Sequence, residues 1–128
     1  MKKVILVTAC FSGMLSVILG AFAAHGLEKI ISFESLASFK TGVQYQMYHS
    51  LFLLLLGVVD IVSLKTKNTV FILVVIGLIF FSGSIYGLAT NSLSSFDFKT
   101  IALITPVGGL LLISSWLLFG IGVIKYKK

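Results

Sequence analysis

The side chains best suited to chemistry in this chain are two histidines and the tyrosines and glutamines beside one of them. His25 follows a run of small residues, and His49 ends the segment Gln44-Tyr45-Gln46-Met47-Tyr48-His49. An imidazole can carry a proton near neutral pH, and it can ligate a metal ion or a haem iron. His49 is therefore our first candidate for a functional group, and His25 is the second.

Other patterns that carry chemistry are absent from the sequence. No cysteine and histidine share a motif, no pair of carboxylates lies within an apolar segment, and no glycine-rich phosphate loop occurs. The single cysteine, Cys10, cannot form a disulfide within the chain. We therefore expect no enzyme activity, no catalytic residue, no metal site and no cofactor.

The composition indicates that lipid is the solvent for most of this chain. Hydrophobic residues make up 58% and charged residues 11% of the sequence, and the mean hydropathy is +1.12. A soluble domain of this length needs more polar surface than 10 basic and 4 acidic residues provide. The elements that position the histidines must therefore be membrane-spanning.

Four apolar segments are long enough to cross a bilayer, because about 20 helical residues at 1.5 Å each span its hydrocarbon core. They cover approximately residues 4–24, 45–64, 69–90 and 100–123. We expect one domain, residues 1–128, that forms an all-α integral membrane four-helix bundle with antiparallel neighbours. Lys2, Lys3 and the first apolar run also resemble a signal peptide, but this run is at the long end for a signal core, so we expect a retained span.

The first loop contains an amphipathic pattern. Phe33, Leu36 and Phe39 fall on one side of a helix, opposite Glu34, and Ser32 can serve as the N-cap. We expect a short interfacial amphipathic helix over approximately residues 33–40, lying at the membrane surface.

Lysine counting predicts the orientation, because the short loops on the cytoplasmic side of membrane proteins carry an excess of Lys and Arg. The two termini and the second loop share one side of the predicted bundle and carry seven lysines: Lys2, Lys3, Lys65, Lys67, Lys125, Lys127 and Lys128. We expect a multi-pass protein of the cell membrane with both termini in the cytoplasm. The net charge of +6 then reflects topology and attraction to anionic lipids, and we expect no nucleic-acid partner.

The topology brings polar side chains from several spans to the outer half of the bundle, where we place a candidate functional polar cluster. Its members are His25, Gln44, Tyr45, Gln46, Tyr48, His49, Tyr86 and Thr105. On the cytoplasmic side, Asp60 is expected to pair with Lys65 or Lys67. Trp116 is expected to pack among apolar residues or to anchor the interface.

Small residues mark the faces where helices are expected to pack. In lipid, close backbone approach over such residues supplies the dispersion contacts that hold a bundle together. The predicted helix-packing residues are Ser12, Gly13, Ser16, Gly20, Gly83, Gly87, Gly108 and Gly109. We favour packing within the chain over a homodimer seam. Pro106 either kinks the fourth span or lies in its first turn.

Several motifs together resemble domain-of-unknown-function family 423 over almost the whole chain. They are Gly20-Ala21-Phe22-Ala23-Ala24-His25-Gly26-Leu27, Phe39-x-Thr41 to His49, Phe81-Ser82-Gly83-Ser84-Ile85-Tyr86, and Thr105-Pro106-Val107-Gly108-Gly109 with Trp116. The resemblance implies a small multi-pass membrane protein, mostly bacterial, with a mitochondrial-type branch in animals. It lends no established activity. Ala23 and Ser115 stand where the family usually has Gly, and both remain small.

Three hypotheses of function follow. We favour a non-enzymatic accessory protein that packs against other membrane proteins, or an envelope-integrity factor, whose partners are membrane lipids, other membrane proteins or a second copy of the chain. The first alternative is a small oligomeric transporter or channel that uses the polar cluster. The second is a haem- or metal-binding protein with His25 and His49 as ligands, joined by Glu28 for a metal.

Overall fold

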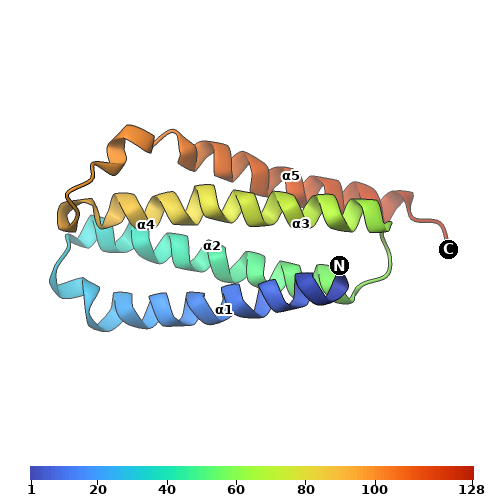
Figure 1. The fold of residues 1–128 in the computed structure, drawn as a ribbon, viewed down its shortest axis with the longest axis horizontal. Coiled ribbons are helices and arrows are strands. Elements are labelled where there is room, and N and C mark those ends of the chain that lie inside the picture. Colours follow the sequence, from blue (N-terminus) through green and yellow to red (C-terminus); the bar gives the residue numbers. More distant parts are fainter.

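The computed structural model describes residues 1–128 as antiparallel helices joined by loops, with no strand (Figure 1). The all-α membrane bundle predicted from the sequence is confirmed. The long helices are α1 (Lys2–His25), α2 (Phe33–Val58), α3 (Leu64–Leu78) with α4 (Ser84–Ala89), and α5 (Ile104–Lys125). A π-helical segment, η2 (Ile79–Gly83), joins α3 to α4 without a break, and short 3-10 turns occupy Leu27–Lys29 (η1), Asn91–Leu93 (η3) and Phe98–Ile101 (η4).

Three helical stretches are both long and apolar enough to cross a membrane: Lys2–Lys29, Leu64–Ala89 and Ile104–Lys125. The fourth long helix, α2, has 26 residues, which is about 39 Å and also long enough to cross. Its first turns carry Glu34 and Lys40 and its middle carries glutamine and histidine, so its hydropathy is lower. It lies between α1 and α3 in the bundle (Figure 1).

The boundaries of three predicted segments, 33–40, 45–64 and 69–90, differ clearly from the structure. Residues 33–40 are helical and Ser32 is the N-cap, accepting from Ser35 N at 3.1 Å, but they continue directly into α2. At its other end α2 stops at Val58, before the predicted 64, because Val59 is extended. Ser63 then caps α3, which begins at Leu64, earlier than the predicted 69. The lysines after Leu64 suggested a loop, yet they lie in the first turn of a helix.

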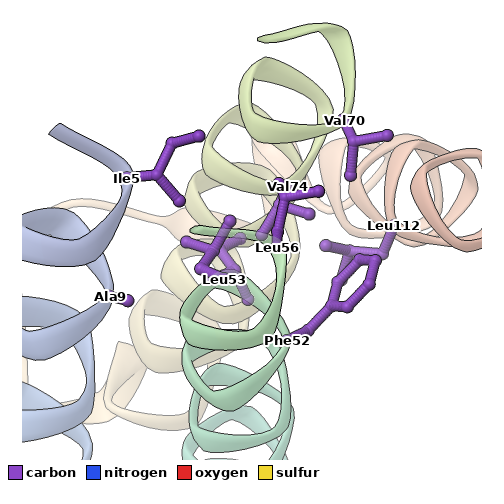
Figure 2. Packing of buried hydrophobic residues seen from close by; sticks show 9 residues of the cluster. Ile5, Ala9, Phe52, Leu53, Leu56, Val70, Val74 and Leu112 are labelled. Atoms are coloured by element: carbon purple, nitrogen blue, oxygen red, sulfur yellow. The ribbon is translucent and has the colours of Figure 1, made fainter. Parts of the chain in front are cut away.

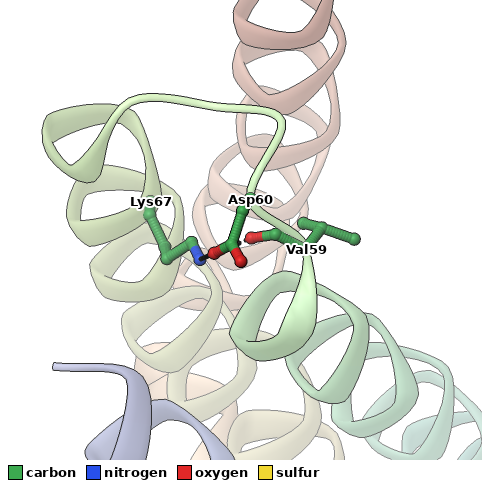
Figure 3. Close-up of polar contacts among 3 residues, drawn as sticks. All are labelled: Val59, Asp60 and Lys67. Atoms are coloured by element: carbon green, nitrogen blue, oxygen red, sulfur yellow. Dashed lines mark hydrogen bonds and ion pairs between the residues drawn. The ribbon is translucent and has the colours of Figure 1, made fainter.

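Lys67, in the first turn of α3, is accommodated by contacts with the end of α2. Its side chain is almost completely buried, because it reaches back to the end of α2. The Nζ atom donates to Val59 O at 2.6 Å and lies 3.7 Å from Asp60 Oδ1 (Figure 3). Val59 caps the end of α2, where carbonyls lack helical partners and a cation is favourable. The predicted pairing of Asp60 with a nearby lysine is confirmed for Lys67.

In the view of Figure 1 the helices follow the order α1, α2, the α3–α4 rod and α5: α1 packs mainly on α2, and α5 packs mainly on α3 and η2, with Trp116 also stacked on Phe52 of α2. Toward the end that holds both termini, the core joins all four layers (Figure 2). Its members are Ile5, Ala9, Phe52, Leu53, Leu56, Val70, Val74, Leu78 and Leu112. A second cluster, of Ala23, Leu27, Leu36, Phe39 and Ala89, closes the opposite end. Because each flanking helix has one main neighbour, most of the α1 and α5 surface is exposed.

The closest helix contact lies where α5 crosses the π-helical segment. A Cβ placed on Gly108 would lie 2.4 Å from Phe81 N and 2.7 Å from Phe80 C, so the two backbones touch there. Ser84 Oγ donates to the Phe80 and Phe81 carbonyls, which satisfies backbone groups at the irregular turn. Pro106 lies in the first turn of α5, just before this contact.

Candidate functional site

The structure divides the predicted polar cluster rather than gathering it. Gln46 and His49 are buried, and Tyr86 and Thr105 are half-buried. The remaining members are exposed: His25, Gln44, Tyr45 and Tyr48. The two buried residues both lie on α2, but Gln46 contacts α1 and α4 whereas His49 contacts α5, so they belong to two separate networks.

The first network is centred on Gln46. Its Nε2 donates to Ser12 O on α1 at 2.9 Å, and its Oε1 accepts from the Tyr86 hydroxyl on α4 at 2.6 Å. Ser50, one turn further along α2, lies 2.7 Å from Gln46 O and 2.8 Å from Ser12 Oγ. One amide side chain thus ties α1, α2 and α4 together, in a region where unpaired polar groups are costly.

The second network joins His49 on α2 to Trp116 on α5. The indole Nε1 of Trp116 donates to His49 Nε2 at 3.0 Å, and His49 Nδ1 lies 2.8 Å from Tyr45 O. An indole nitrogen only donates and a carbonyl oxygen only accepts. His49 is therefore the neutral tautomer with its hydrogen on Nδ1, and both ring nitrogens have partners. The Trp116 ring also stacks on Phe52, with centroids 4.1 Å apart and planes 7° from parallel.

The hypothesis that His25 and His49 ligate one haem or metal is contradicted. Ala23 and Leu27 pack against Leu36 and Phe39, so His25 is level with those α2 residues. His49 lies at least 10 residues further along α2, which is about 15 Å along the helix axis. Its Nε2 lone pair is also occupied by Trp116. No group of three or more His, Cys, Asp or Glu side chains lies close enough together to hold a metal ion, so Glu28 does not complete a site.

The depth of the networks also corrects the sequence prediction. Ser12 is near the middle of α1, Gln46 and His49 are near the middle of α2, and Trp116 is near the middle of α5. The buried polar groups therefore lie near the middle of the bundle, not in the half away from the termini where the sequence analysis places them. In that half remains a smaller contact, in which Ser84 and Thr105 share a hydrogen bond between α4 and α5.

Sequence reasoning missed two members of these networks. Ser50 is not among the residues predicted from the sequence, and Trp116 is predicted only to pack among apolar residues or to anchor the interface. The missed signal in Trp116 is its indole N–H, which needs an acceptor when buried. His49 on α2 supplies that acceptor.

The predicted packing residues mostly lie at helix contacts. Ser12 and Ser16 are in the Gln46 network or beside it, Gly13 and Gly20 face Ser50 and Val43, Gly87 lies under Phe98, and Gly108 and Gly109 face η2. Gly83 differs, since a Cβ on it would meet no atom within 4 Å. Tight contacts at Gly42, Gly57, Gly77 and Gly122 were not predicted.

Gly83 opens instead onto a cavity that we call the central groove. It has a volume of about 450 Å³ and runs between α1 and the α3–η2 rod, with α2 as its floor. Its lining is Thr8, Phe11, Ser12, Gln46, Leu53, Val75, Leu78, Ile79, Ser82, Gly83 and Tyr86. The Gln46 network thus forms a polar patch in an otherwise apolar groove. A smaller cavity of about 280 Å³ lies against His49 and Trp116.

Comparisons with known proteins agree with this architecture. The profile of the family described as "Protein of unknown function (DUF423)" matches residues 19–109. A "UPF0382 membrane protein" of Staphylococcus saprophyticus is 39% identical, over 96% of this chain and 98% of that protein. The "UPF0382 inner membrane protein YgdD" of Escherichia coli is 32% identical, over 99% of this chain and 94% of that protein.

YwdK of Bacillus subtilis, also named a "UPF0382 membrane protein", is 36% identical over 97% of this chain and 98% of its own length. No solved structure matches the chain. Since the relatives align over nearly their full length, the whole helical row and both buried networks lie within the matched region. This membrane protein therefore belongs to the DUF423 family.

Proposed function

We propose that this chain is a non-enzymatic accessory protein of the cell membrane that works by packing sideways against another membrane protein. The observation that carries the proposal is that α1 and α5 lie at the two edges of the bundle with most of their surface exposed. Large side chains on both flanking helices face outward, among them Met14 and Val17 on α1 and Leu110 and Leu117 on α5. Exposed flanks of this kind offer long surfaces to a partner helix.

The chemistry of the buried networks supports a structural rather than a catalytic role. His49 uses both ring nitrogens in hydrogen bonds, and Gln46 joins three helices. A general base or a nucleophile must instead keep a lone pair free for substrate. The transporter alternative requires an oligomer, because the polar groups at the centre of one chain bond to one another. A flux assay in proteoliposomes with His49→Ala tests that alternative separately.

Photo-crosslinking in intact membranes tests the accessory role. A photoreactive amino acid is placed at Met14 or Leu117, one on each exposed flank. We expect at least one position to give a discrete adduct with a different protein, because the flank lies against a partner helix. The matched control is Phe33, which is also exposed but lies in the first turn of α2 at the end of the bundle. Lipid adducts alone at both flank positions would contradict the proposal.

A further inference from the structure

The central groove has the size of a small-molecule site, since such sites span about 300–1,000 Å³ and are mostly apolar with a few polar groups. It opens toward the bilayer between α1 and η2 and lies at mid-depth. None of its lining residues is charged. Any molecule that occupies it must therefore be neutral and soluble in lipid.

The hydroxyl groups in the groove differ from those elsewhere in the helices. Membrane-buried Ser and Thr side chains commonly donate to the backbone carbonyl one turn earlier, and Ser16, Thr69 and Ser114 do so. Thr8 makes no such bond and has no other partner. Ser12 Oγ lies 2.8 Å from Ser50 Oγ, and because the single Ser50 hydrogen points to Gln46 O, the Ser12 hydrogen is used in the bond to Ser50. These two residues are one helical turn apart on α1, on the groove wall.

Gln46 adds an independent second donor. Its side chain lines the groove although the residue is only 8% exposed. The Nε2 atom carries two hydrogens, and only one is used, toward Ser12 O. The carbonyl acceptors beside it are engaged, because Gln46 Oε1 accepts from Tyr86 and Ser12 O accepts from both Gln46 and Ser16. The Thr8 hydroxyl and the second hydrogen on Gln46 Nε2 thus face the groove without a free strong acceptor beside them.

We propose that the central groove binds a neutral, lipid-soluble carbonyl compound of the quinone class. A ring carbonyl oxygen supplies the acceptor that the Thr8 hydroxyl and the second Gln46 Nε2 hydrogen lack, while the ring contacts Phe11, Leu78 and Ile79. A hydrocarbon tail leaves through the open side into the bilayer. The ester carbonyls of phospholipids lie near the membrane surface, whereas Gln46 lies near the middle of α2 and Thr8 lies about 9 Å along the axis from the start of α1. This proposed binding site is additional to the accessory role. The quinone-binding experiment tests it separately from the crosslinking experiment.

Binding of menaquinone-4 to the full chain tests the proposal. The protein is reconstituted in phosphatidylcholine nanodiscs and titrated with this quinone, and nanodiscs without protein measure partitioning into lipid. We expect saturable binding with one quinone per chain. A tail-matched compound in which the ring carbonyls are absent should bind at least about threefold more weakly, as expected for the loss of one or more hydrogen bonds.

Two pairs of variants locate the site. Gly83→Leu fills the groove without a clash, because no atom lies within 4 Å of its Cβ position, and it should reduce affinity at least tenfold. Gly120→Leu is the matched control at an equally open position on α5, away from the groove, and should bind normally.

Thr8→Val should weaken binding about threefold to tenfold, the effect of one hydrogen bond. Thr69→Val removes a hydroxyl outside the groove and should have no effect.

The melting temperature of each of the four variants is measured as a control for folding. A loss of binding counts only for a variant whose melting temperature is close to that of the wild-type protein. The proposal is overturned if the wild-type chain binds no quinone above the lipid background. It is also overturned if the carbonyl-free compound binds equally well, which would make the groove a site for a plain acyl chain. Normal binding by Gly83→Leu would place the quinone elsewhere. Crosslinking of a Gly83→Cys variant to another protein in native membranes would also overturn the proposal, because it would assign the groove to a partner helix.

Discussion

At the scale of single residues, the most informative group is His49, because its partners define its chemistry. Taken alone, a histidine in a membrane span suggests a proton relay or a ligand. The Trp116 indole and the Tyr45 carbonyl instead fix one neutral tautomer and use both ring nitrogens. His49 therefore serves as a hydrogen-bonded bridge between α2 and α5.

Replacing the indole tests this bridge. Trp116→Phe keeps an aromatic ring against Phe52 but removes the N–H, so we expect the free energy of unfolding in bicelles to fall by about 0.5–1.7 kcal/mol. His49→Phe should cost a similar amount, and the double variant should cost less than the sum because both changes break one bond. Tyr48→Phe is the control, since the Tyr48 hydroxyl is exposed and unbonded. Strictly additive effects would show that the two side chains are not coupled.

At the scale of elements, the contact between α5 and η2 determines how closely two helices approach. Gly108 brings the α5 backbone against the Phe80–Phe81 peptide. Ser84 and Thr105 then link α5 to α4, which continues directly from η2. The irregular turn is thereby held both by packing and by side-chain hydrogen bonds.

A single methyl group tests this contact. Gly108→Ala would place a carbon 2.4 Å from Phe81 N, and backbone cannot move aside as a side chain can. We expect the helices to separate at a cost of about 1–3 kcal/mol, seen as a lower melting temperature in detergent. Gly120→Ala adds the same methyl group at an open position on the same helix and should leave the melting temperature unchanged. Equal stability of the two variants would refute the close approach.

At the scale of the whole molecule, the row of helices places both termini and the α2–α3 loop at one end (Figure 1). Six lysines at that end remain outside the Lys67–Asp60 pair: Lys2, Lys3, Lys65, Lys125, Lys127 and Lys128. The opposite end has lysines balanced by Glu28, Glu34 and Asp97. We propose that the lysine-rich end faces the cytoplasm, as the charge rule requires.

Reporter fusions check this orientation. Green fluorescent protein joined after Lys128 should fluoresce and alkaline phosphatase at the same point should be inactive, because the first matures in the cytoplasm and the second outside it. Alkaline phosphatase inserted at Ser95, in the α4–α5 loop at the opposite end, should be active. The reverse pattern would place the termini outside.

Much of this fold was accessible from sequence, because hydropathy and helix length specify spanning helices directly. Ser32 as a cap and the Asp60 ion pair were also predictable, since both depend on neighbours along the chain. The partners of Gln46 and His49 were not, because they depend on how helices from distant parts of the sequence rotate toward one another. The sequence therefore indicates packing for Ser12, and packing or an interface anchor for Trp116, and it places the polar groups too far from the end that holds the termini.

The π-helical segment has a consequence for that rotation. Its wider turn contains one more residue than an α-helical turn, and one residue corresponds to about 100° around a helix. The segment therefore determines the direction in which the side chains of α4 point. Removing one residue from Ile79–Gly83 would restore a regular helix and swing Tyr86 by that angle away from Gln46. The local irregularity is thus an angular offset between the two halves of one rod, which allows α3 to face the apolar core while α4 presents its tyrosine to the central amide.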